Sequence, residues 1–232
     1  MRNLAEIGIF TEYDAVNERA FAIASLDLSQ YRLIVVAPGL HREETIAKLN
    51  EYIEGGGSVI FLGGLGEGRN IDDTGQRETR LHIERQATES LRSGRIQIAV
   101  SQPNPLNLEL AYDGLYHETY ILHFDVNNDN YQPIGKFNWI TADGTIQPLD
   151  GYPLVIYHDK SKPESGWVLY WGALQSWQIA EYDWNDKSDL YYLHREIFRA
   201  FANFIGIGEA VASAETKDMI ISQGMLENSM LM

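Results

Sequence analysis

One short stretch of the sequence combines a histidine with two carboxylates. His41 follows Pro38 and Gly39, and Glu43 and Glu44 come shortly after it. Because a neutral imidazole titrates near pH 7, a histidine beside a carboxylate can act as a general base. The other interpretation, which we favour, is a loop histidine followed by acids that stabilise the beginning of a helix through its dipole.

A glycine-rich segment, Gly63–Gly68, follows an apolar run and offers consecutive backbone N–H groups. Such groups can bind an anion or a small polar ligand at the carboxyl ends of strands. The segment lacks the Lys-Ser/Thr pair of a P-loop, and no helix pattern follows it directly, so we favour a tight turn with a structural role. If a ligand binds, the residues expected to contact it are Gly39, Gly63, Gly64, Gly66 and Gly68, and the candidate catalytic groups are His41, Glu44 and Glu67.

The segment Asp125–Asp129 carries oxygen ligands at alternate positions, as the beginning of a calcium-binding loop does. However, Asn130 stands where such a loop has glycine, and Lys136 stands where it has a bidentate glutamate, so a polar turn is the better interpretation. His117 and His123 have a spacing that does not by itself indicate a metal site. We therefore predict no metal site and no cofactor.

The charge balance excludes several classes of partner. Lys and Arg number 18 against 33 Asp and Glu, which gives a net charge of −15. A field of this sign repels phosphate backbones and anionic lipids, so we expect neither a nucleic-acid nor a membrane partner. The chain has no cysteine, which excludes disulfides and thiolate nucleophiles. No stretch reaches the ~20 apolar residues of a membrane span, and Met1–Phe10 lacks the apolar core of a signal peptide, so we expect a cytoplasmic protein.

The N-terminal half has the alternating pattern of an α/β protein. Arg32–Ala37 and Ser58–Leu62 are continuous β-branched and apolar runs, which is typical of strands buried on both faces. Between them, Glu43–Glu54 has helical spacing and ends in three glycines. This strand–helix–strand unit predicts a parallel sheet. Upstream, Glu6–Phe10 is a candidate strand and Ala15–Ser25 a candidate helix.

The rest of the chain is predicted to be rich in strands. A weak helical period favours a helix over Glu78–Arg92, and a strong one predicts a helix over Asp189–Ile205 that packs on the sheet. The loop Asp159–Gly166 is short enough to join its flanking strands as a hairpin. The predicted strands are Arg95–Val100, Thr119–Phe124, Lys136–Thr141, Tyr152–His158 and Trp167–Trp171, the last of them apolar on both faces and therefore internal.

Two segments, Leu26–Gly68 and Asp150–Gly172, resemble the class I glutamine amidotransferase-like superfamily, and are most similar to the trimerisation domain of bacterial β-galactosidases. The likeness lies in a Tyr-led strand ending at Pro38, a helix ending in a triple glycine, a second strand opening into a glycine-rich turn, and the hairpin before the last helix. The resemblance implies a flavodoxin-like three-layer sandwich with a parallel central sheet and an antiparallel C-terminal extension. Residues 1–208 would form this domain, and residues 209–232 a Met-rich tail.

Enzymes of this superfamily carry a nucleophilic cysteine in the turn that corresponds to Gly63–Gly68. This sequence has Leu65 and Gly66 there instead. The resemblance therefore implies a non-catalytic domain for assembly or binding, with a link to carbohydrate metabolism, as a homo-oligomer or in a larger glycosidase-type assembly. The aromatic residues and the tail are the expected contacts. Two alternatives are a hydrolase of a sugar or small polar substrate, using His41 and carboxylates, and a small-molecule sensor.

Overall fold

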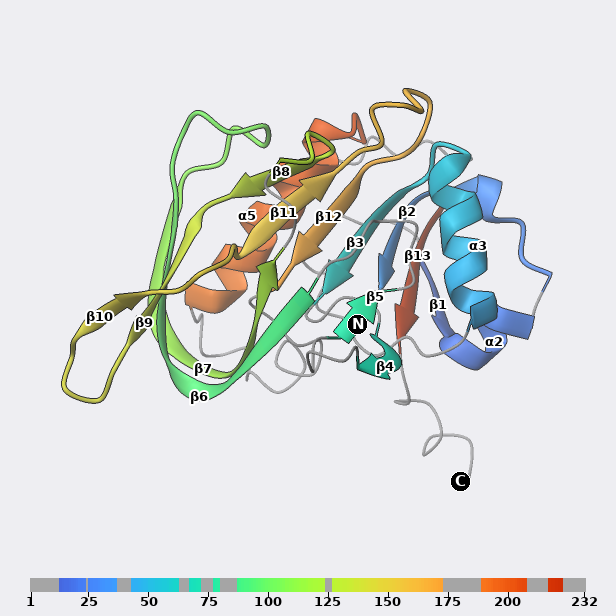
Figure 1. Ribbon diagram of the computed structural model, residues 1–232. Coiled ribbons are helices and arrows are strands. Elements are labelled where there is room, and N and C mark those ends of the chain that lie inside the picture. The colour runs from blue at the N-terminus through green and yellow to red at the C-terminus, as the bar shows by residue number, and fades with distance from the viewer. Residues whose placement is uncertain are drawn as a thin grey trace.

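The computed structural model of the chain describes residues 13–23, 25–36, 43–62, 67–71, 77–79, 87–123, 127–172, 189–207 and 217–222. Its main element is a seven-stranded sheet (Figure 1). In spatial order its strands are β1 (Tyr13–Asn17), β13 (Lys217–Ser222), β2 (Tyr31–Val36), β3 (Ser58–Leu62), β12 (Val168–Trp171), β11 (Leu154–Tyr157) and β8 (Tyr131–Ile134). The strands from β1 to β12 in this order are parallel, whereas β11 pairs antiparallel with both β12 and β8. The predicted α/β class is therefore confirmed.

The predicted strand–helix–strand unit is present. β2 and β3 pair in parallel, with Leu33 opposite Ser58, and α3 (Glu43–Glu54) connects them. The helix ends in a Schellman motif, in which the Gly57 N–H donates to the Tyr52 carbonyl at 2.9 Å and the Gly56 N–H to the Ile53 carbonyl at 3.0 Å. Gly56 has a φ of 97°, a conformation that glycine adopts without the Cβ penalty. The triple glycine is thus a helix stop, as the sequence indicates.

Helices cover both faces of the main sheet (Figure 1). On one face lie α2 (Glu18–Ile23) and α3; on the other lies α5 (Asp189–Phe204). The first face includes the buried residues Phe21, Ile34, Leu49, Val59 and Phe61, and the second includes Leu33, Ile60, Leu169, Ile197 and Phe201. Alternate residues of β2 and β3 thus enter different clusters, which explains why these strands are apolar throughout. No helix of the described residues is long and apolar enough to cross a membrane.

A second, antiparallel sheet joins the cluster that contains α5. Its strands are β10 (Ile146–Pro148), β9 (Lys136–Ile140), β6 (Ala87–Val100) and β7 (Leu110–His123), in that spatial order. β6 and β7 form the long curved hairpin of Figure 1. A small separate sheet pairs β4 (Glu67–Ile71) with β5 (Arg77–Thr79).

Two of the predicted helices are corrected. The helix predicted over Glu78–Arg92 is wrong, because residues 77–79 form β5 and residues 87–92 belong to β6. β7 pairs with β6 over its length, and this long-range pairing outweighs a weak local helical period. The helix predicted over Ala15–Ser25 begins only at Glu18, after β1. Asn17 sets that start, because its side-chain oxygen accepts a hydrogen bond from the Ala20 N–H at 2.8 Å.

The predictions for the two ends of the chain have different outcomes. The strand predicted over Glu6–Phe10 lies outside the described residues. At the other end, residues 217–222 form β13, which pairs in parallel with both β1 and β2 inside the main sheet. The segment expected to be a tail therefore supplies a strand to this sheet.

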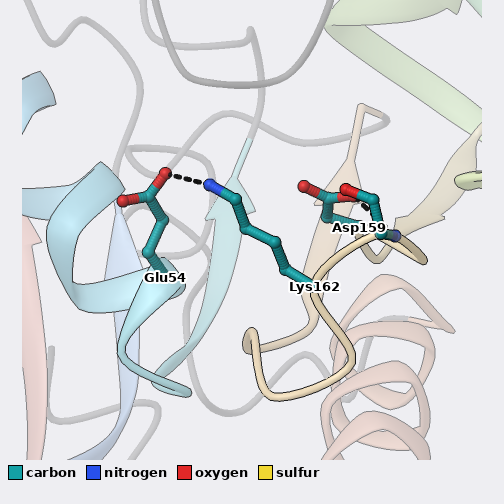
Figure 2. Close-up of polar contacts among 4 residues, drawn as sticks. Glu54, Asp159 and Lys162 are labelled. Atoms are coloured by element: carbon teal, nitrogen blue, oxygen red, sulfur yellow. Dashed lines mark hydrogen bonds and ion pairs between the residues drawn. The ribbon is translucent and has the colours of Figure 1, made fainter.

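The hairpin loop between β11 and β12 packs against the corner between α3 and β3. The loop between β11 and β12 brings Gly166 so close that its N–H donates to the Ile53 carbonyl at 2.7 Å. A Cβ on Gly166 would overlap the backbone of Gly57. Beside this contact, Lys162 Nζ donates to Glu54 Oε1 at 2.7 Å, a bond that raises the pKa of the lysine (Figure 2). The loop thus holds β12 in parallel register beside β3.

Gly166→Ala should lower the free energy of unfolding by about 3 kcal/mol or more, because neither backbone can move aside without disturbing the pairing of β12 with β3. Gly55→Ala is the matched control, since its Cβ would lie 3.3 Å from the Glu51 carbonyl oxygen in the same corner. We expect the control to cost less than about 1 kcal/mol. Urea unfolding followed by circular dichroism measures both losses, and equal losses would contradict this role for Gly166.

Candidate functional site

The site predicted from the sequence follows the carboxyl ends of the parallel strands. β2 ends at Val36 and β3 at Leu62, and in open α/β sheets this edge is the usual ligand site. The predicted residues that follow these ends directly, Gly39, His41, Gly63, Gly64 and Gly66, lie outside the described residues. The binding turn and the histidine–carboxylate pair therefore stay predictions.

The other candidates lie on different elements. Glu44 is an exposed residue in the first turn of α3. Glu67 and Gly68 do not continue the predicted turn but open β4, in which Glu67 pairs with Thr79 of β5. The backbone there is extended because it has a partner strand, which the glycine content of the segment did not reveal. The two candidate catalytic groups that the structure describes therefore lie on different elements. Glu44 is on α3, and Glu67 is on the small sheet formed by β4 and β5.

A buried histidine lies close to the carboxyl end of β12. His194 of α5 accepts a hydrogen bond at Nδ1 from the indole N–H of Trp171, over 2.9 Å. This bond places the ring proton on Nε2, which is buried and has no partner among the described residues. Burial lowers the pKa of His194 from 6.5 to about 3, so the ring is neutral at pH 7. In the sequence, helical spacing puts His194 on the same side of Asp189–Ile205 as the apolar residues, but no local signal indicates its tryptophan partner.

Two further buried oxygens lie on the other face of the sheet. Tyr170 precedes Trp171 on β12 and stacks on Phe61, with ring centroids 5.3 Å apart. Its hydroxyl has no hydrogen-bond partner in the described part of the chain, and neither has that of Thr45 in α3. Burial, together with the neighbouring Tyr131 and Tyr157, raises the pKa of Tyr170 well above 10.0. The phenol is therefore protonated at pH 7 and is no nucleophile there.

In the candidate calcium-binding segment Asp125–Asp129, the structure describes the residues from Asn127 on, and these form a polar turn. Asn128 accepts a hydrogen bond from the Asn130 N–H at 3.0 Å, and Asn130 accepts one from the Lys160 N–H at 3.0 Å. Asp129 lies 3.8 Å from the Lys160 ammonium. The oxygens of Asn130 and Asp129 thus bind Lys160 in the loop between β11 and β12. Among the residues that the structure describes, no group of three or more His, Asp or Glu side chains could hold a metal ion.

An open cavity lies at the opposite, amino edge of the main sheet. It has a volume of about 830 Å³ and lies where β2 and β3 begin. Three segments surround it: the connection from α2 to β2, the turn after α3 and the turn after α5. The residues that line it are Ser25, Leu26, Asp27, Leu28, Ser29, Tyr31, Arg32, Lys48, Glu51, Tyr52, Gly55, Gly56, Gly57, Ser58, Ile205, Gly206 and Ile207.

Both helices reach the cavity with their C-terminal ends. α5 ends as α3 does, because the Ile207 N–H donates to the Ala202 carbonyl at 2.8 Å and the Gly206 N–H to the Asn203 carbonyl at 3.1 Å. The C-terminus of a helix carries a partial negative charge. In the third segment, Asp27 accepts two hydrogen bonds from Ser29, which lower its pKa. Hydrogen-bonded turns therefore form the walls. In the sequence, Gly55–Gly57 indicate only a helix stop, and no local signal indicates the cavity.

The buried histidine makes stability depend on pH. The unfolded chain binds a proton at His194 near pH 6.5, and the folded chain binds one only near pH 3. The contribution of the neutral, buried ring to the free energy of unfolding is therefore fully present above pH 6.5 and is lost as the pH falls. From pH 7 to pH 5, the wild type should lose about 2 kcal/mol more than His194→Gln, which keeps an acceptor for Trp171. Urea unfolding at both pH values measures this difference. Equal losses in the two proteins would show that His194 is not buried as a neutral ring.

No family model matches the chain, and no curated protein matches its sequence. Among solved structures, it is similar to a β-galactosidase from Rahnella sp. R3, with a TM-score of 0.48 and 16% identity over 79% of this chain and 25% of that one. It is also similar to a ThuA-like protein from Bacteroides uniformis, with a TM-score of 0.46 and 10% identity over 78% and 73%. The mmIFT52 N-terminal domain gives a TM-score of 0.47 and 13% identity over 83% and 82%. The chain thus spans only 25% of the β-galactosidase that it matches.

Proposed function

We propose that the chain is a non-catalytic, amidotransferase-like domain with a flavodoxin-like arrangement, and that it serves binding and assembly. One observation carries the proposal: the strand–helix–strand unit β2–α3–β3 is built, yet the chain has no cysteine to place after β3. Without a thiolate, the amide hydrolysis of such enzymes has no nucleophile. The link to carbohydrate metabolism rests on the sequence resemblance of Leu26–Gly68 and Asp150–Gly172.

The described polar groups near the carboxyl edge favour a binding role. His194 is neutral at pH 7 and its Nδ1 is taken by Trp171. Tyr170 is protonated and fully buried. Neither group has the proton affinity of a catalyst that works near pH 7. In this proposal their role is to hold α5 and α3 on the sheet.

Two exposed apolar side chains are candidate contacts for assembly. Ile146 on the edge strand β10 and Ile23 on α2 are the large hydrophobic side chains most exposed in the described part, with 53% and 75% of their surface accessible. An edge strand offers unpaired backbone groups to a second strand, so we propose β10 as the contact with a second copy of the chain. Of the aromatic residues expected at contacts, Trp171 lies in the core, and Trp167 stacks on His158 and contacts Phe204 edge-on.

Light scattering after gel filtration should give a mass above one chain over a range of concentrations. Ile146→Lys should lower that mass towards 26.3 kDa, because the charge blocks pairing at the β10 edge. Ile23→Lys is the control, since it adds the same charge on an exposed helix, and it should leave the mass unchanged. A wild type that is monomeric at every concentration would contradict the assembly role.

Incubation of the purified protein with L-glutamine tests the non-catalytic role. We expect no ammonia above the level of a buffer blank, because the chain holds no thiol nucleophile. A coupled glutamate dehydrogenase assay measures the release. Saturable release of ammonia that persists through a second purification step would contradict the proposal.

A further inference from the structure

We infer that the cavity at the amino edge binds a small zwitterion with an ammonium and a carboxylate group, of the class of the aliphatic α-amino acids. This inference rests on the proposed binding role and names its site and its ligand. The cavity volume of about 830 Å³ lies within the range of small-molecule sites. Its walls are hydrogen-bonded turns, so little ordering is needed when a ligand enters.

Two oppositely charged side chains of the cavity have no partner among the described residues. Arg32 and Glu51 both line it, both are exposed, and neither forms a hydrogen bond or an ion pair with any residue that the structure describes. The other charged side chains of the lining are occupied. Lys48 donates to the Phe21 carbonyl at 2.8 Å, and Asp27 accepts hydrogen bonds from Ser29. One free guanidinium and one free carboxylate therefore face a ligand, and they complement a molecule that carries both signs.

Glu51 lies in the last turn of α3. A carboxylate there is repelled by the partial negative charge of the helix C-terminus unless a cation lies beside it. Glu54, in the same turn, has its cation, since Lys162 lies 2.7 Å away (Figure 2). Glu51 has none in the described part of the chain. The C-terminus of α5 adds a second partial negative charge. The ammonium group of the ligand would thus lie near Glu51, and its carboxylate near Arg32.

The lining of the cavity also has an apolar part. Leu26, Leu28, Ile205 and Ile207 line the cavity, and each is only partly buried. They offer contact to an aliphatic side chain, which a purely ionic or sugar ligand would leave unused. L-leucine is therefore the probe that matches both the charges and the apolar wall.

Isothermal titration calorimetry with three probes tests the assignment of each charge. L-leucine carries both groups, L-leucinamide lacks the carboxylate, and 4-methylpentanoate lacks the ammonium. Arg32→Gln should weaken L-leucine and 4-methylpentanoate about tenfold or more and leave L-leucinamide unchanged. Glu51→Gln should weaken L-leucine and L-leucinamide by a similar factor and leave 4-methylpentanoate unchanged.

Matched controls lie outside the lining of the cavity. Glu109→Gln changes the same residue type at an exposed position before β7, and Arg19→Gln removes an exposed arginine on α2; both should bind like the wild type. Circular dichroism checks that all variants fold, which is expected because the four side chains are exposed. No saturable binding of L-leucine by the wild type, or equal affinities in all variants, would overturn the inference. Binding of galactose by a wild type that does not bind L-leucine would also overturn the inference. The ammonia assay and the light scattering test the proposed function separately from this result.

Discussion

The close backbone contact of Gly166 with Gly57 is the constraint on which the arrangement depends. It brings the loop after β11 onto the corner between α3 and β3, so that β12 adds to the parallel strands rather than staying in a separate hairpin. Only glycine permits this approach, because any Cβ at position 166 would overlap the neighbouring backbone. Once β12 is in register, its alternating side chains join the clusters under α3 and α5 and close both faces of the sheet.

This arrangement gives the sheet two edges with different chemistry. Near the carboxyl edge, His194 and Tyr170 are buried, and at pH 7 the imidazole is neutral and the phenol is protonated. At the amino edge, two helix ends and the segment before β2 surround an open cavity with charged side chains. A fold of this type usually binds at the carboxyl edge. We propose that binding in this chain uses the amino edge, with assembly through the edge strand β10.

The sequence predicted the elements whose signals are local and dense. α3 and β3 have the predicted bounds, because apolar spacing and the triple glycine define them without tertiary context. Of β6, only Arg95–Val100 was predicted as a strand, and β13 was not predicted, because the strand state of these segments depends on partners far along the chain. The cavity was missed for the same reason: Ser25–Ser29, Gly55–Gly57 and Ile205–Ile207 meet only in the folded sheet. The bond between Trp171 and His194 likewise joins residues 23 positions apart.

Ligand binding at the amino edge of the sheet can be located by amide chemical-shift mapping by NMR with added L-leucine, which reports every non-proline backbone position at once. We expect the largest shifts at Gly55–Gly57, Ile205–Ile207 and Ser29, which line the cavity. Shifts concentrated instead at Leu62 and Trp171, the carboxyl ends of β3 and β12, would contradict it.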